Sequence, residues 1–178
     1  MSRAEQLRRR MGALMADGFF RGASRLGRLH PRARPEAHGL TVTRDVAYDP
    51  AHPERRLDVW RPAASAATPR PAVVYVHGGG FRILSKETHW VMALAFARRG
   101  YTVFNVDYRL APRHPFPAAL EDLAAAWAWV VAHAAEYGAD ARRLALAGES
   151  AGANLVTALT AAACFARDEP YARRVFDT

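Results

Sequence analysis

Cysteine is nearly absent from this 178-residue chain, which contains only Cys164. One thiol cannot form an internal disulfide framework or a cysteine-based metal site. Long hydrophobic runs are absent as well, because no stretch approaches the ~18 consecutive apolar residues of a membrane-spanning helix. We therefore expect one globular core and no transmembrane segment, and a cytoplasmic location is the simplest one for so few thiols.

Lysine is also scarce, because Lys86 is the only lysine among 25 basic residues in a chain of net charge +8. Residues 1–40 contain nine arginines and three acidic residues, a net charge of +6, so the remaining residues carry only +2. The basicity therefore belongs to an N-terminal arm and not to the body. Since these arginines fall on no recognisable reading element, we expect no nucleic-acid binding.

The N-terminal arm has the pattern of an amphipathic helix over residues 3–29, with apolar residues spaced by three and four. These residues are Leu7, Met11, Leu14, Met15, Phe19, Leu26 and Leu29. Gly18 and Gly22 are expected to weaken or break the helix. We favour a helix that covers part of its own domain; a transit peptide and a membrane-surface helix are the alternatives.

Residues 41–178 predict an α/β fold. Two segments of alternating apolar and polar residues, joined by a proline-rich turn, predict an antiparallel pair of strands. Three later apolar runs, each followed by a helical segment, predict parallel strands buried on both faces. The sheet is then mostly parallel, with about five strands and flanking helices. The predicted strands are residues 41–48, 56–61, 72–76, 101–106 and 144–147, and the predicted helices are residues 87–99, 116–137 and 151–167.

A serine flanked by glycines follows the last predicted strand, in Gly148-Glu149-Ser150-Ala151-Gly152. A nucleophile on a strand-to-helix turn needs a strained backbone, and larger residues at the two glycine positions would clash. The turn also aims Ser150 at the N-terminus of the next helix, whose dipole favours developing negative charge. The alternative is that Ser150 merely caps that helix.

A run of glycines follows another predicted strand, in His77-Gly78-Gly79-Gly80. Successive glycines leave backbone N–H groups free to approach a ligand oxygen, although a triple glycine alone also fits a flexible loop. Both segments lie at the carboxyl ends of parallel strands, where α/β sheets place their sites. Together with the N–H of Ala151, this loop could form an oxyanion hole.

Three segments, taken together, resemble one known family: HGGGF at His77–Phe81, DYRLAPRHPFP at Asp107–Pro117 and GESAG at Gly148–Gly152. They are similar to those of the hormone-sensitive-lipase-like carboxylesterases (α/β-hydrolase fold-3) within the α/β-hydrolase superfamily. The resemblance implies a carboxylic-ester hydrolase with a small-molecule ester substrate and no metal or organic cofactor. It implies Ser150 as the nucleophile, Gly79, Gly80 and Ala151 as oxyanion-hole donors, and His77, Gly78, Gly148, Glu149 and Gly152 as supports of the site.

The same resemblance implies a division of the chain. Residues 1–40 would be a cap-like helical arm, and residues 41–178 the N-terminal portion of a hydrolase domain. Such an enzyme needs a histidine base and an orienting carboxylate, which follow the serine in this fold. All seven histidines precede Ser150, and the 28 residues after it offer only Asp168, Glu169 and Asp177.

We therefore expect these residues to be the N-terminal portion of an esterase, because the five predicted strands fall short of the family's eight. A truncated gene product, a fragment and one half of a split protein are all compatible with this expectation. The chain by itself is expected to be inactive, because loss of a triad member lowers turnover by orders of magnitude. Two other functions stay open: a non-catalytic ligand-binding module, and a protein whose sheet is completed by a partner chain.

Overall fold

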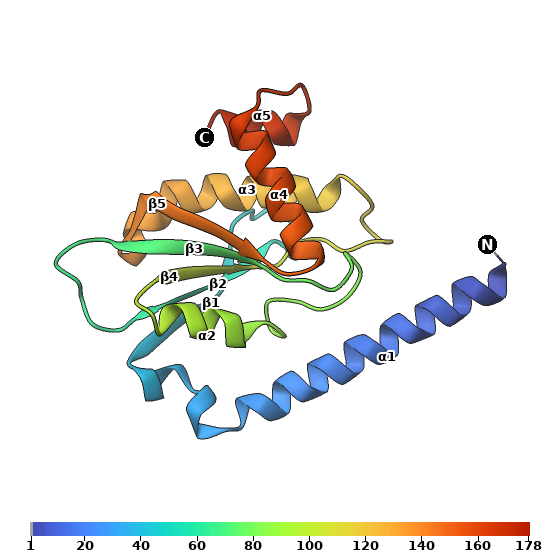
Figure 1. The fold of residues 1–178 in the computed structure, drawn as a ribbon, viewed down its shortest axis with the longest axis horizontal. Helices are drawn as coiled ribbons and strands as arrows, with labels where there is room; N and C mark the ends of the chain where they lie inside the picture. Colours follow the sequence, from blue (N-terminus) through green and yellow to red (C-terminus); the bar gives the residue numbers. More distant parts are fainter. Residues whose placement is uncertain (1) are drawn as a thin grey trace.

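The computed structural model describes residues 2–178 and contains one five-stranded sheet with helices on both faces (Figure 1). The strand order is β1-β2-β4-β3-β5. The strands are β1 (Leu40–Ala47), β2 (Arg56–Pro62), β3 (Arg70–Val76), β4 (Thr102–Val106) and β5 (Ala139–Gly148). The α/β class and the five strands predicted from the sequence are confirmed.

The strand directions differ in one respect from the expectation. β1 and β2 are antiparallel, as predicted, but β2 also lies antiparallel to β4. Only the β3–β4 and β3–β5 pairs are parallel. The sheet is therefore half antiparallel rather than mostly parallel.

Helices cover both faces of the sheet because β3 and β4 are apolar on both sides. α2 (Trp90–Ala97) packs on one face, and α3 (Ala118–His133) and α4 (Ala151–Cys164) cover the other (Figure 1). α5 (Pro170–Phe176) packs against α3 and α4. Short 3-10 turns complete the element order: η1 (Pro31–Ala33), η2 (Pro35–His38) and η3 (Ala134–Tyr137). α2 is shorter than predicted, because residues 85–89 form a hydrogen-bonded turn before it.

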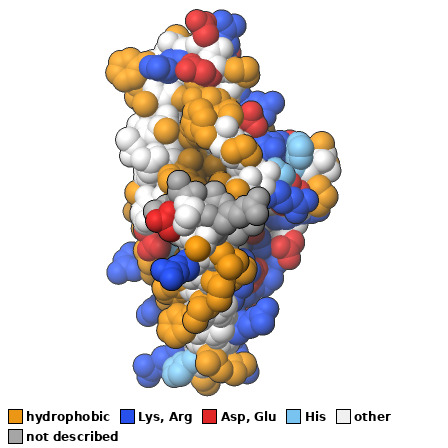
Figure 2. Space-filling view, turned by 90° about the vertical axis from the view of Figure 1, so that its right-hand side faces the viewer, with side chains coloured by type: hydrophobic (Ala, Val, Ile, Leu, Met, Phe, Trp, Pro, Cys, Tyr) orange, Lys and Arg blue, Asp and Glu red, His pale blue; other side chains and the backbone are white. Residues whose placement is uncertain are grey.

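The N-terminal helix α1 runs unbroken over Arg3–Arg28, so the expectation that Gly18 and Gly22 break it is wrong. Each glycine costs roughly 1 kcal/mol relative to alanine. A capping box of Ser2 and Glu5 and contacts with the body oppose that cost. Within residues 2–178 the polar side of α1 contacts the body, and its apolar side stays exposed (Figure 2). The cap-like role of residues 1–40 remains a prediction.

The three sequence segments of interest leave the sheet at the same level. Val76, the last residue of β3, pairs with Val106 at the end of β4 and with Gly148 at the end of β5. His77, Asp107 and Glu149 are therefore the first residues beyond one common edge. No helix within residues 2–178 combines the length and hydropathy needed to cross a bilayer.

Candidate active site

The turn from β5 to α4 holds Ser150 in a strained conformation, with φ 50° and ψ −118°. Few residues other than glycine adopt a positive φ, and such strain persists only where neighbouring structure enforces it. Ser150 is exposed, and its hydroxyl makes no capping hydrogen bond to α4. Ser150 therefore occupies the N-cap position of α4, but its side chain does not cap the helix.

The two glycines of this turn are required by close packing. A Cβ at Gly152 would lie 2.1 Å from the carbonyl oxygen of Val76, and a Cβ at Gly148 would lie 2.7 Å from the carbonyl carbon of Gly152. Both distances are far below van der Waals contact. The turn thus packs backbone to backbone against the end of β3, which brings Ser150 beside the glycine-rich loop.

The glycine-rich loop presents free backbone donors on the same edge. Gly79 has φ +110°, and a Cβ there would lie 2.0 Å from the carbonyl oxygen of Ile83. Gly80 has φ +59° and open space around its Cβ position. Within residues 2–178, the N–H groups of Gly79, Gly80 and Ala151 donate no hydrogen bond. Three unused donors are therefore available near the strained serine turn.

His77 is a buried support of this loop. Its ring stacks on Tyr108 at 4.4 Å, and the Tyr108 hydroxyl donates to the His77 carbonyl oxygen at 3.0 Å. Nδ1 of His77 donates to the carbonyl oxygen of Gly78 at 2.7 Å. Burial lowers the pKa of His77 to about 3, so the ring is neutral at neutral pH.

A contact that sequence reasoning missed joins the serine turn to the start of α2. Nε2 of His89, at the start of α2, lies 2.8 Å from Oε1 of Glu149. The Glu149 carboxylate also lies over Gly78, where a Cβ would come within 3.0 Å of Oε1. His89 and Glu149 are 60 residues apart, and no spacing in the sequence links them.

Lys86 is the second group that sequence reasoning missed. Its ammonium, 2% exposed, donates to Asp45 and Asp58 at 2.8 Å each and to Glu87 at 3.1 Å. Burial alone would lower the pKa of Lys86, but the hydrogen bonds to Asp45 and Asp58 raise it above its ordinary value. Only the scarcity of lysine singled the residue out.

The Lys86 group also accounts for a set of carboxylates that could otherwise hold a metal ion. The carboxylates of Asp45, Asp58 and Glu87 lie within 4.8 Å of one another. The ammonium of Lys86 already lies among them. The Lys86 main chain is held too, because its N–H donates to Asp107 at 2.6 Å and its carbonyl accepts from Asn105 at 3.0 Å.

No base for Ser150 is found among the described histidines. None of them forms a hydrogen bond with its hydroxyl within residues 2–178. The acidic residues that follow Ser150 lie at the ends of α5, remote from the common strand edge in Figure 1. Asp168, for example, pairs with Arg173 at 2.8 Å. The structure therefore brings the serine turn and the glycine loop together but does not join a base or an acid to them.

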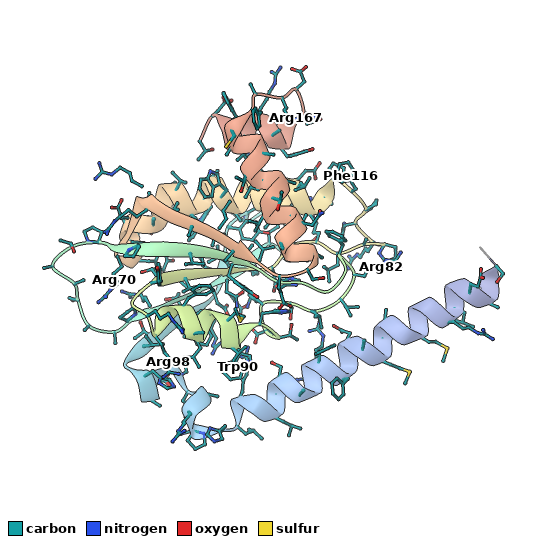
Figure 3. The ribbon with its side chains drawn as sticks, viewed as in Figure 1. Arg70, Arg82, Trp90, Arg98, Phe116 and Arg167 are labelled. Carbon is teal, nitrogen blue, oxygen red and sulfur yellow. The ribbon has the colours of Figure 1, made fainter. Side chains whose placement is uncertain are left out.

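An apolar cleft of about 350 Å³ lies between the start of α3, α4 and the loop after β4. Its lining includes Phe81 from the glycine loop, Asn154 and Leu155 from α4, and Phe116. Figure 3 shows Phe116 on the segment that leads into α3. A small apolar group would fit there.

Comparison with known proteins identifies the family. Residues 73–173, more than half of the chain, match the model of a family described as having the alpha/beta hydrolase fold. The chain belongs to the α/β-hydrolase family. The matched range includes both the glycine loop and the serine turn.

The relatives of this α/β-hydrolase are esterases and lipases. Esterase LipI of Mycobacterium tuberculosis is 40% identical over 134 residues, which cover 74% of this chain and 42% of that protein. Hormone-sensitive lipase of Homo sapiens is 39% identical over 113 residues, covering 62% of this chain and 10% of that protein. The expected resemblance to hormone-sensitive-lipase-like proteins is thereby confirmed.

A solved esterase structure is also similar to this chain. The crystal structure of esterase LipW from Mycobacterium marinum aligns with a TM-score of 0.72 at 39% identity, covering 85% of this chain and 47% of that one. This α/β-hydrolase chain spans less than half the length of LipI and LipW.

Proposed function

We propose that these residues carry the nucleophile and the oxyanion hole of a carboxylic-ester hydrolase. The observation that carries the proposal is the state of Ser150: its backbone is strained, its side chain is exposed, and its hydroxyl makes no capping hydrogen bond. The unused N–H groups of Gly79, Gly80 and Ala151 support it, because an oxyanion needs donors that are not already occupied. His77, Gly78, Gly148, Glu149 and Gly152 then hold the two loops in place.

The chemistry proposed for this arrangement is acyl transfer in two steps. A base removes the proton from the Ser150 hydroxyl as Oγ attacks the ester carbonyl carbon. The resulting oxyanion accepts hydrogen bonds from Gly79, Gly80 and Ala151, and collapse of the intermediate expels the alcohol. Water then attacks the acyl-serine by the same route, and the acid product leaves. The apolar cleft, whose lining includes Asn154 one helical turn after Ser150, suits a hydrophobic part of a small ester.

The base and its orienting carboxylate are proposed to come from outside these 178 residues. No histidine follows Ser150, and none of the described histidines hydrogen-bonds it. Turnover by the chain alone should therefore be close to background. A cytoplasmic location and the absence of nucleic-acid binding stay predictions from composition.

Hydrolysis of a short-chain p-nitrophenyl ester tests this proposal, with wild type and Ser150→Ala compared in the absence and presence of imidazole as an added base. We expect equal rates without imidazole and a faster wild type with it, because the added base replaces the missing one. Serine-dependent turnover without imidazole would contradict the claim that the chain lacks a base for Ser150. If folded wild type and folded Ser150→Ala have equal rates in both conditions, the claim that Ser150 is the nucleophile is contradicted.

A second candidate function is one half of a hydrolase that a partner chain completes. Among the described strands β5 pairs only with β3, so its other edge is open. Leu144 and Leu146 on β5 are only partly buried. An open apolar edge favours pairing with another strand. Co-purification with a chain that supplies strands, an acid and a histidine would support this candidate; a stable monomer in the cell would count against it.

A further inference from the structure

A short turn between the glycine-rich loop and α2 contacts all three segments that meet at the common strand edge. This turn consists of residues 85–89 and is called here the 85–89 turn. It is closed by its own hydrogen bonds: the N–H of Thr88 donates to the carbonyl oxygen of Ser85 at 3.0 Å, and the N–H of His89 donates to that of Lys86 at 3.2 Å. The hydroxyl of Thr88 also donates to the Ser85 carbonyl oxygen, at 2.7 Å. The chemistry proposed for Ser150 uses none of these side chains.

Lys86 anchors one side of the 85–89 turn. Its ammonium donates to Asp45 on β1 and to Asp58 on β2, at 2.8 Å each. Its main-chain N–H donates to the carboxylate of Asp107, the first residue after β4, at 2.6 Å. The turn is therefore fixed to three strands before it reaches α2.

His89 forms the other side of the turn, and its ring is buried and held in one orientation. Nδ1 lies 2.9 Å from the hydroxyl oxygen of Thr88 and 3.1 Å from the carbonyl oxygen of Ser85. The Thr88 hydroxyl already donates to Ser85, so Nδ1 donates to these oxygens. The opposite ring nitrogen, Nε2, is thereby turned toward Oε1 of Glu149 at 2.8 Å. The ring also lies 5.6 Å from the ring of His77.

Glu149 passes this contact on to the nucleophile turn, because it directly precedes Ser150. Its carbonyl oxygen accepts a hydrogen bond from the N–H of Gly152 at 2.8 Å, and a Cβ at Gly78 would lie 3.0 Å from both that oxygen and Oε1. The Glu149 side chain is 55% exposed, so burial alone does not fix it. Its contact with His89 does, and the contact is an ion pair when both ring nitrogens carry a proton.

The strain at Ser150 needs such a support. A residue other than glycine keeps a positive φ only where neighbouring structure enforces it. The Ser150 hydroxyl gives no help, since it makes no capping hydrogen bond. Close packing at Gly152 holds the turn on one side of Ser150, and the Glu149 carboxylate is the group available on the other side. Figure 1 shows that α2 starts below the same sheet edge at which β5 turns into α4.

We propose that His89 is a positioning residue for Ser150. Through Glu149 it holds the nucleophile turn against the glycine-rich loop, and the 85–89 turn and Lys86 hold His89 itself. His89 touches no substrate in this role and acts only through Glu149. The proposal rests on the proposed function as far as Ser150 is the nucleophile, whereas the holding of the turn stands on the contacts alone.

Three variants of the full chain test this role. His89→Leu removes both ring nitrogens, and His89→Gln keeps an amide N–H that can donate to Glu149 from near the place of Nε2. The matched control is His133→Leu, at the end of α3, where the histidine ring stacks on Trp129 and Nδ1 donates to the Trp129 carbonyl oxygen at 2.8 Å. All three should fold, because the half-exposed Glu149 carboxylate can be hydrated in His89→Leu; circular dichroism checks this.

Two quantities are measured for each variant. One is the rate at which an alkyl fluorophosphonate modifies Ser150 in the presence of imidazole, and the other is hydrogen exchange of the Gly152 amide, which donates to Glu149. We expect His89→Leu to lower the rate about ten-fold and to speed the exchange about ten-fold, the effect of losing one hydrogen bond to a charged group. His89→Gln should recover most of both losses. His133→Leu should behave as wild type.

The outcomes separate this proposal from the proposed function. Wild-type values for His89→Leu would overturn the positioning role, and so would equal losses in His89→Leu and His89→Gln, because the ring would then act only by filling space. Faster exchange with an unchanged Ser150 rate would overturn it as well. If Ser150 of the wild type reacts no faster than other serines, the proposed function fails, and the exchange of Gly152 still decides whether His89 holds the turn.

Discussion

At the scale of single residues, backbone geometry defines this site more than side-chain chemistry does. Within residues 2–178 the proposed nucleophile Ser150 has no base or acid beside it, but Gly148 and Gly152 next to it are required where the backbone of the turn packs closely. The sequence could predict these glycines because their need is local: a strained turn and a loop with free donors each occupy five residues or fewer. His89 could not be predicted in the same way, since its partner Glu149 is brought to it only by the pairing of β3 with β5.

Two glycine-to-alanine substitutions separate a glycine required by packing from one that is not. Gly152→Ala places a methyl group 2.1 Å from the Val76 carbonyl oxygen and should lower the free energy of unfolding by about 3 kcal/mol or more. Gly18→Ala, in α1 with nothing within 4 Å, should raise it by up to ~1 kcal/mol. Urea unfolding measures both. Similar effects of the two changes would contradict the packing argument.

At the scale of elements, the strands were predictable and the lengths of the helices were not. β3 and β4 are short continuous apolar runs that are buried on both faces, a pattern that predicts central strands of a sheet. α2 begins later than its pattern suggests because Lys86 and Glu87 are used in ion pairs that hold the preceding turn. α1 continues through Gly18 and Gly22 because the local penalty of each glycine is small beside the hydrogen bonds of a 26-residue helix.

Lys86 joins three elements, and its removal should loosen them together. Lys86→Met leaves the buried carboxylate of Asp58 and its neighbours Asp45 and Glu87 without their cation. Breaking such a group costs about 3 kcal/mol or more, because a buried charge loses its partner. Arg113→Met, at an exposed arginine without an ion pair in the described chain, should change stability by less than about 0.5 kcal/mol. Thermal and urea unfolding of both variants decide the point; a loss below about 1 kcal/mol for Lys86→Met would refute it.

At the scale of the whole molecule, the site lies where one sheet edge collects three segments from distant parts of the chain. Residues 77–80, 107–112 and 149–152 meet because Val76, Val106 and Gly148 are in register. The order of strands and helices along the sequence predicted that residues 77–80 and 149–152 would meet. The orientation of α1 could not be predicted, because an apolar helical pattern does not say which partner receives it.

The proposed role of Ser150 is that of a nucleophile whose oxyanion hole is already formed. An alkyl fluorophosphonate with added imidazole, followed by peptide mapping in a mass spectrometer, reports the reactivity of each serine separately. We expect modification of Ser150 well ahead of every other serine, and no modification of that peptide in Ser150→Ala. Labelling of Ser150 no faster than the other exposed serines of the folded protein would contradict it.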